Sequence, residues 1–237
     1  MRTQPTLLAA TFIAAMALTT VASAHLVTPL DEKEGKRFDE AAGIASRAGY
    51  ADAAVFWHGA GEWDSLFLLE GTHGKDLRGQ LLVIAPAGST STGIVDLQAT
   101  ERVNRLDVIV TRLFDKPEVL DVAITGSPFQ LETSTMRTIH YVVSTGEKPS
   151  LRGTVWGSIA SSTAKGDKSW ESKRVVTLVA DHAAKTPTIV VTTKEETIER
   201  PIPGIGGADR KETRNATPPA TKRFELSGAS GPMVELK

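Results

Sequence analysis

TIHYVVSTGEKPSLRGTVWGSI, residues 138–159, is the stretch of sequence that decides the fold. Two apolar runs, TIHYVV (138–143) and GTVWGSI (153–159), flank a polar segment that contains Gly, Pro and Ser. Strand-length runs rich in β-branched residues, on either side of a polar turn, predict two antiparallel strands joined as a hairpin. This stretch therefore indicates a β-sheet protein.

Similar apolar runs recur roughly every ten residues on both sides of this hairpin, a spacing typical of antiparallel sandwiches and barrels. They are AAVFW (53–57), SLFLL (65–69), QLLVI (80–84), LDVIV (106–110), VLDVAI (119–124), RVVTLVA (174–180) and TIVVTT (188–193). We therefore expect a mainly β protein, with an antiparallel β-sandwich or barrel-like sheets as a β-rich core over residues 51–200.

Two parts of this core resemble each other. Around Leu77-Arg78-Gly79 and around Leu151-Arg152-Gly153, an apolar run, a polar turn, Leu-Arg-Gly, a second apolar run and a Ser/Thr-rich segment follow in the same order. One interpretation is that hairpins built from common residues resemble each other by chance. The other is a duplicated β-meander, with halves at about 53–125 and 138–193. A duplication would describe the architecture and name no function.

The segment before the core, residues 25–50, has a helical pattern. Phe38, Ala41, Ala42, Ile44, Ala45 and Ala48 recur at the spacing of one helix face within residues 31–48. Asp31 is a suitable N-cap residue. The sequence therefore predicts one N-terminal helix, weakened by the glycines at positions 35 and 43.

The end of the chain has a different composition. Residues 201–222 are rich in charged residues, Thr, Pro and Gly, and such segments bury too little apolar surface to offset the entropy lost on ordering. We expect a mobile polar loop or linker there, followed by a C-terminal strand or tail at 223–237. Asn215 begins an Asn-Ala-Thr triplet, which is an N-glycosylation acceptor if the source is eukaryotic.

Residues 1–24 have the features of a signal peptide. Arg2 precedes an uncharged apolar stretch at 7–22, which ends in Ala22-Ser23-Ala24, a small-x-small cleavage pattern. The stretch is shorter and less apolar than the roughly 20 residues that a membrane span needs. We therefore expect cleavage before His25 and a secreted product without stable membrane insertion, extracellular or, in a Gram-negative bacterium, periplasmic.

Composition and motifs exclude several classes of function. The chain has no cysteine, which excludes disulfides, thiolate catalysis and iron–sulfur clusters. A formal net charge of −1 does not resemble the basic footprint of a nucleic-acid-binding protein. The Ser-rich stretch at 89–92 lacks the glycine that precedes the serine in a nucleophile elbow. Gly59-Ala60-Gly61 is followed by Glu62 and Asp64, whose charges would repel a phosphate.

The segment FWHGAGEWDS (56–65) is the best localised binding candidate. It gathers two of the four tryptophans with a histidine and two carboxylates. Aromatic rings beside carboxylates suit sugar binding, and aromatic anchors also dominate many protein interfaces. The candidate binding residues are Trp57, His58, Glu62, Trp63 and Asp64. The alternative interpretation is a hairpin loop whose tryptophans fold back into the core.

His25 raises the question of a copper site. An N-terminal histidine binds copper through its amine and its ring, and a second histidine completes the site. Four histidines could serve as the second ligand, and His140 is favoured because strand side chains have fixed directions. The four are His58, His73, His140 and His182. The chain lacks a His-x-His pair and a methionine cluster. We therefore expect no cofactor, and keep copper bound by His25 and His140 as the alternative.

Together these features favour a secreted, non-catalytic binding protein, such as a microbial effector or an adhesion or virulence factor. Its partner would be a protein or a carbohydrate at a cell or host surface, and no nucleic acid. The alternative class is an extracellular enzyme, either a copper-dependent oxidase that uses His25 or a carbohydrate-active hydrolase.

Overall fold

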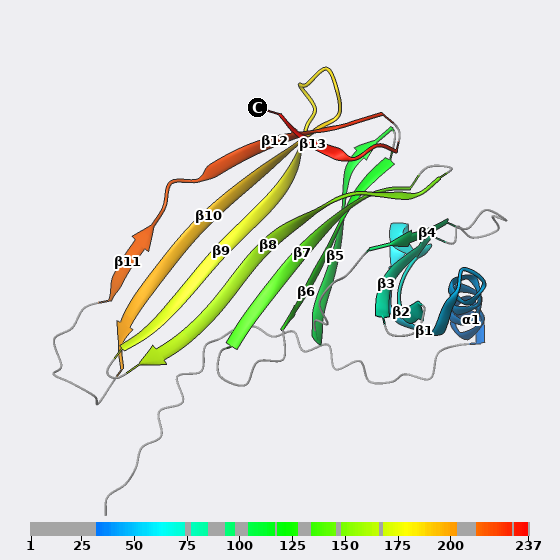
Figure 1. Ribbon diagram of the computed structural model, residues 1–237, viewed down its shortest axis with the longest axis horizontal. Coiled ribbons are helices and arrows are strands. Elements are labelled where there is room, and N and C mark those ends of the chain that lie inside the picture. The colour runs from blue at the N-terminus through cyan, green and yellow to red at the C-terminus, as the bar shows by residue number, and fades with distance from the viewer. Residues whose placement is uncertain are drawn as a thin grey trace, which may run out of the picture.

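The computed structural model describes residues 32–73, 77–84, 93–97, 104–116, 118–127, 134–145, 148–165, 168–202, 212–228 and 230–236. Within these ranges the chain forms one α-helix, one 3-10 helix and two antiparallel sheets (Figure 1). The prediction of a mainly β protein with an N-terminal helix is confirmed, and neither sheet closes into a barrel. No helix in the described part of the chain is long and apolar enough to cross a membrane.

Helix α1 (Glu32–Arg47) follows the predicted pattern. Ala41, Ile44 and Ala45 are buried on one face, and Phe38 packs beside them. The helix ends before Gly49, whose φ of 94° is the left-handed conformation that glycine adopts readily. The apolar face therefore fixes α1 against the strands that follow.

The small sheet has four strands in the order β1-β2-β3-β4. They are β1 (Tyr50–His58), β2 (Leu66–His73), β3 (Leu77–Ile84) and β4 (Gly93–Asp96). The 3-10 helix η1 (Gly61–Trp63) lies between β1 and β2. The Tyr50 hydroxyl donates to Asp96 Oδ2 over 2.8 Å, which links the two edge strands. Burial, followed by this hydrogen bond, raises the pKa of Tyr50 to about 12.

The large sheet has nine strands, eight of them in the order β13-β12-β10-β9-β8-β7-β6-β5 and the ninth, β11, paired to β10. They are β5 (Asn104–Asp115), β6 (Glu118–Ser127), β7 (Ser134–Ser144), β8 (Ser150–Lys165), β9 (Lys168–Asp181), β10 (Thr188–Pro201), β11 (Thr213–Ala216), β12 (Ala220–Leu226) and β13 (Met233–Leu236). The apolar residues of every predicted run lie in a strand, and the strands from β8 to β10 extend well beyond their runs.

Three apolar clusters hold these layers together. One lies between α1 and the small sheet and contains Phe67 and Leu69. The next joins the other face of the small sheet to the large sheet, where Leu66 and Leu68 meet side chains of β6 and β7. Alternate residues of β2 therefore serve two different cores, as strand geometry requires. The order of layers is helix, small sheet, large sheet (Figure 1).

The third cluster lies on the opposite face of β6 and β7. Val119 and Val142 there meet Val176 of β9 and Ile189 of β10. Strand β5 supplies Leu113 to the same cluster, so the large sheet curls around it without closing. The β7–β8 register shifts twice, between Arg137 and Ile139 and between Val142 and Val143, which is where a strand can bend.

Arg152 fixes the C-terminal hairpin to this curled sheet. Only 2% of its surface is exposed, and its guanidinium donates hydrogen bonds to the backbone carbonyls of Ser227, Gly228 and Gly231. Burial lowers the pKa of Arg152. At Gly153, a side-chain Cβ would lie 3.1 Å from Met233 Cε, so β13 approaches β8 closely. The hairpin of β12 and β13 thus covers the start of β8.

Some sequence expectations differ from the structure. Of the predicted loop at 201–222, residues 203–211 lie outside the described residues, and the rest contains β11 and the start of β12, because backbone pairing with β10 orders segments whose composition is polar. The two suggested halves do not form two matching sheets, since β5 and β6 of the first half belong to the large sheet. The predicted signal peptide and His25 lie outside the described residues.

Candidate functional site

The segment Trp57–Asp64, called the tryptophan loop from here on, connects β1 to β2 through η1. Trp57 and Trp63 are partly buried, and both pack against the apolar cluster between the two sheets. At Gly59 an added Cβ would lie 2.1 Å from the Trp63 carbonyl oxygen, so the loop closes tightly on itself. Part of each indole therefore packs into the core, as the alternative interpretation of this segment expects.

Strand β5 holds the loop through Arg112. Its guanidinium carbon lies 5.1 Å from the centre of the Trp63 ring, within the range of a cation–π contact. The same guanidinium lies 3.2 Å from Glu62 Oε2. Arg112 also lies 3.3 Å from Glu118 Oε1. One arginine of the large sheet thus binds two neighbouring side chains of the loop.

Helix α1 holds the loop from the other side. Arg37 donates a hydrogen bond to the backbone carbonyl of Asp64, and its guanidinium carbon lies 5.3 Å from the centre of the Phe67 ring. The His58 ring packs against two phenyl rings, with centres 5.4 Å from Phe38 and 5.8 Å from Phe67. His58 therefore contributes packing between helix and sheet.

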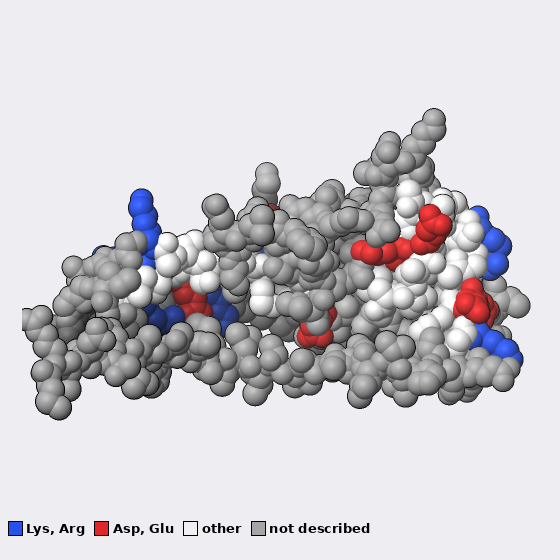
Figure 2. Space-filling model, turned by 90° about the horizontal axis from the view of Figure 1, so that it is seen from below, with Lys and Arg blue, Asp and Glu red and all other residues white. Residues whose placement is uncertain are grey.

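The groups that the loop presents to solvent are acidic. The Glu62 side chain is 60% exposed, and Asp64 is exposed as well. Acidic and basic side chains lie next to one another at both ends of the face drawn in Figure 2, so its described part carries no extended field of one sign. The loop is thus a rigid turn with an acidic rim.

His140, the favoured second copper ligand, lies in the core with 8% of its surface exposed. Its Nδ1 lies 2.9 Å from Asp121 Oδ2 and 3.1 Å from Oδ1. A Cβ added at Gly157 would lie 2.9 Å from His140 Nε2, so the backbone of β8 covers this nitrogen. Nε2 is buried and has no hydrogen-bond partner among the described residues. This position does not favour exchange with a metal ion in solvent.

The two other histidines whose side chains the structure describes, His58 and His182, pack against phenyl rings elsewhere. His182 lies against Phe114, with ring centres 5.8 Å apart, and the side chain of His73 is outside the described residues. Among the residues that the structure describes, no three His, Asp or Glu side chains form a group that could hold a metal ion. The copper site built on His25 stays a prediction.

Asn215, the predicted glycosylation acceptor, lies in β11, opposite Thr197 of β10. All four residues of this strand are exposed. The Thr217 backbone N–H of the same triplet donates to the Glu195 carbonyl over 3.0 Å. The acceptor is therefore accessible on an ordered strand.

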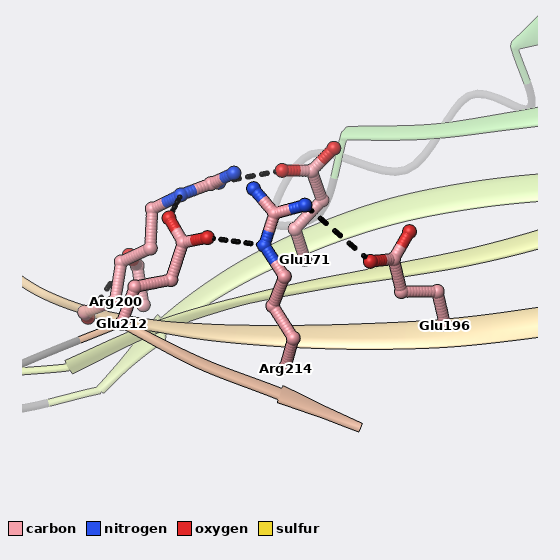
Figure 3. A network of polar contacts seen from close by, with 6 residues as sticks. Glu171, Glu196, Arg200, Glu212 and Arg214 are labelled. Carbon is pink, nitrogen blue, oxygen red and sulfur yellow. Dashed lines mark hydrogen bonds and ion pairs between the residues drawn. The ribbon is translucent and has the colours of Figure 1, made fainter. Parts of the chain in front are cut away.

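Sequence reasoning missed a network of ion pairs at the far ends of β9, β10 and β11 (Figure 3). Arg200 lies 2.6 Å from Glu171 and 2.9 Å from Glu212. Arg214 lies 2.5 Å from Glu212 and 3.8 Å from Glu196. Mixed charges on an alternating strand pattern such as KEETIER (194–200) could have indicated such cross-strand pairs.

This network lies at the protein surface, and its charged side chains remain partly exposed to solvent. Hydrogen bonds from Arg214 and then Arg200 lower the pKa of Glu212. Ile198 is 8% exposed, and its direct neighbours across the strands are Glu171 and Arg214. The aliphatic stems of these charged residues therefore cover an isoleucine while their charged groups stay in solvent.

Comparison with known proteins adds no family to this description. No protein-family model, no curated protein and no solved structure matches the chain.

Proposed function

We propose that this chain is an exported, non-catalytic binding protein that contacts a protein partner at a cell or host surface through the acidic rim of the tryptophan loop. A microbial effector or adhesion factor would use such a surface. The observation that carries the proposal is the double anchoring of the loop, by Arg112 of β5 and by Arg37 of α1.

Anchoring matters because a rigid loop loses little conformational freedom when a partner binds. The carboxylate of Glu62 keeps its exposure although Arg112 fixes its position. A carboxylate held in this way suits a partner that presents lysine or arginine. Aromatic residues beneath the rim keep water away from the contact, as the surroundings of an interface hot spot do.

The geometry favours a protein over a sugar. A sugar ring stacks on a free aromatic face, but Arg112 lies over the Trp63 ring and the apolar cluster takes part of the indole. Catalysis is less favoured for a related reason. His58 packs between phenyl rings, and Arg112 binds Glu62, so neither side chain is placed as a proton-transfer group.

The test is binding of the purified chain from His25 onward to intact cells, to a panel of basic proteins and to immobilised glycans. The double variant Glu62→Gln/Asp64→Asn should lose most of the binding to cells and to protein. Glu235→Gln, an exposed acid on β13, serves as the matched control and should bind normally. Equal binding by the double variant and the original chain would contradict the proposal.

The alternative enzyme class is tested with the same material. The purified chain is incubated with polysaccharides, with and without copper and a reductant. We expect no product in any mixture. Product release at catalytic protein concentrations, abolished by removing copper or by replacing a carboxylate, would show an enzyme instead.

A further inference from the structure

The edges of the two sheets differ in how well they are protected against pairing with another chain. An edge strand exposes unpaired N–H and C=O groups, and proteins guard such edges with short strands, bulges and charges. In the described chain, β4, β11 and β13 have four residues each. Strand β1 is longer, but its register shifts twice and Asp52 has a φ of 52°.

Strand β5 is the exception. It has 12 residues and ends the large sheet, and no strand in the described part of the chain pairs with its outer edge. Its two register shifts lie near its ends, so Asp107 to Arg112 pairs with β6 without interruption. Ile109, at the centre of this stretch, is 54% exposed, and Asp107 and Thr111 are exposed on either side.

The sequence of this edge is complementary to itself. In an antiparallel pair centred on Ile109, this residue faces Ile109 of a second copy, and Val108 faces Val110. Asp107 then faces Thr111, whose hydroxyl can donate to the carboxylate. No two like charges face each other. Moving the centre to Val110 would place Val108 opposite Arg112, which loses the apolar pair.

We propose that β5 pairs antiparallel with β5 of a second copy of this chain, centred on Ile109, so that the two large sheets become one continuous sheet. Backbone hydrogen bonds supply the attraction, and the apolar row of Val108, Ile109 and Val110 sets the register. The interface is small, so the dimer should dissociate on dilution. The acidic rim of the tryptophan loop is not part of the pairing.

The absence of native cysteine allows a direct test by cross-linking. Residues directly opposite in an antiparallel pair have Cα atoms about 4.5–5.5 Å apart, which a disulfide can span. Under mild oxidation, Ile109→Cys should form a covalent dimer. Val179→Cys, a more exposed position (60%) inside the sheet, is the matched control and should stay monomeric.

A mixture of two single-cysteine variants tests the register of the proposed β5–β5 pairing. Asp107→Cys and Thr111→Cys should cross-link to each other efficiently and should form few dimers when each is oxidised alone. Sedimentation velocity of the original chain should show a reversible dimer. Ile109→Lys should weaken dimerisation at least tenfold, and Val179→Lys should leave it unchanged.

A monomeric original chain at high concentration would overturn the proposal, as would equal cross-linking of Ile109→Cys and Val179→Cys. Thermal melting of each variant shows whether it folds, and the mixed pair of variants provides the result if Ile109→Cys alone does not fold. Cross-linking and sedimentation do not involve a binding partner of the tryptophan loop. A negative result for dimerisation therefore leaves the proposed function untouched, and a negative result in the binding test leaves the dimer proposal untouched.

Discussion

The β6–β7 hairpin and the far ends of β9, β10 and β11 are parts of one sheet, yet different forces hold them. Side chains of the hairpin enter apolar clusters on both of its faces. No apolar cluster of the described residues includes a residue from 192–216, and the ends of these strands project beyond the small sheet (Figure 1). Ion pairs lie there instead (Figure 3). We call the small sheet together with the β6–β7 hairpin the layered body, and the far ends of β9, β10 and β11 the charged arm.

The comparison teaches that strand pairing alone does not set local stability. Buried apolar area contributes about 25 cal/mol per Å² in the layered body. Exposed ion pairs contribute about 1 kcal/mol or less and weaken as salt screens them. The layered body should therefore be the last part to open, and the charged arm the first.

The largest expected effect is a cavity in the layered body. Leu68 is completely buried between the two sheets, so Leu68→Ala should lower the free energy of unfolding by about 2–5 kcal/mol. Val179→Ala, at a site that is 60% exposed, should change it by less than about 0.5 kcal/mol. Denaturant unfolding of both variants measures the difference, and similar values for the two would remove the distinction between core and surface.

A buried arginine should matter more than an exposed one. Arg152→Met keeps most of the side-chain volume but removes the donor of three part-buried hydrogen bonds to backbone carbonyls, at a cost of about 3 kcal/mol. Arg214→Met removes ion pairs of the charged arm, where the side chain is 62% exposed, and should shift the melting temperature little. A larger shift for Arg214→Met would show that the ion network does more than cover the surface.

Trp63→Ala is expected to have an intermediate effect. Trp63 is partly buried against the apolar cluster and lies beneath Arg112, so truncation should cost about 2 kcal/mol, below the 3–5 kcal/mol of a fully buried tryptophan. Trp156→Ala, at a tryptophan that is 46% exposed, is the control and should cost less. An unchanged melting temperature for Trp63→Ala would show that the indole does not support the loop.

Acid should act on the charged arm before the layered body. The pKa of Glu212 is lower in the folded protein than in the unfolded chain, where it is near 4.5. The ionised Glu212 carboxylate therefore contributes fully to stability above about pH 4.5, and this contribution is lost as the pH falls through the folded-state pKa. The NMR signal of the Arg200 Nε–H, which donates to Glu212 Oε2 over 2.9 Å, should therefore shift below pH 4.5 while signals of β6 and β7 remain.

Glu212→Gln is the control for this pH effect, because it removes the titrating group. In this variant the Arg200 Nε–H signal should change less over the same pH range. Simultaneous loss of signals from the arm and from β6 and β7 would mean that acid unfolds the chain as a single unit.

Apolar runs rich in β-branched residues were enough to predict the strands from β1 to β3 and from β5 to β10. The runs at 138–143 and 153–159 became β7 and β8, and the spacing of Ala41, Ile44 and Ala45 placed the buried face of α1. The polar composition of β11 predicted a mobile loop instead of a strand. Its residues are exposed, and only backbone pairing with β10 orders them. The layer order also escaped prediction, since nothing local marks which sheet a hairpin joins.

The tryptophan loop was predicted as a cluster of residues, but its anchors were not. Arg37 and Arg112 come from 20 or more residues away on either side, and no local pattern links them to Trp63 or Asp64. His140 was singled out because its strand fixes its direction. In the structure, the His140 side chain points into the core and contacts Asp121.

Hydrogen exchange at low and at high salt tests the central comparison most directly. Amides of β6 and β7 should exchange slowest, with little response to salt. Amides of β11, and of β10 where it pairs with β11 from Glu196 to Glu199, should exchange faster, and faster again as salt screens the ion pairs. Equal protection of the two regions, unchanged by salt, would contradict the account.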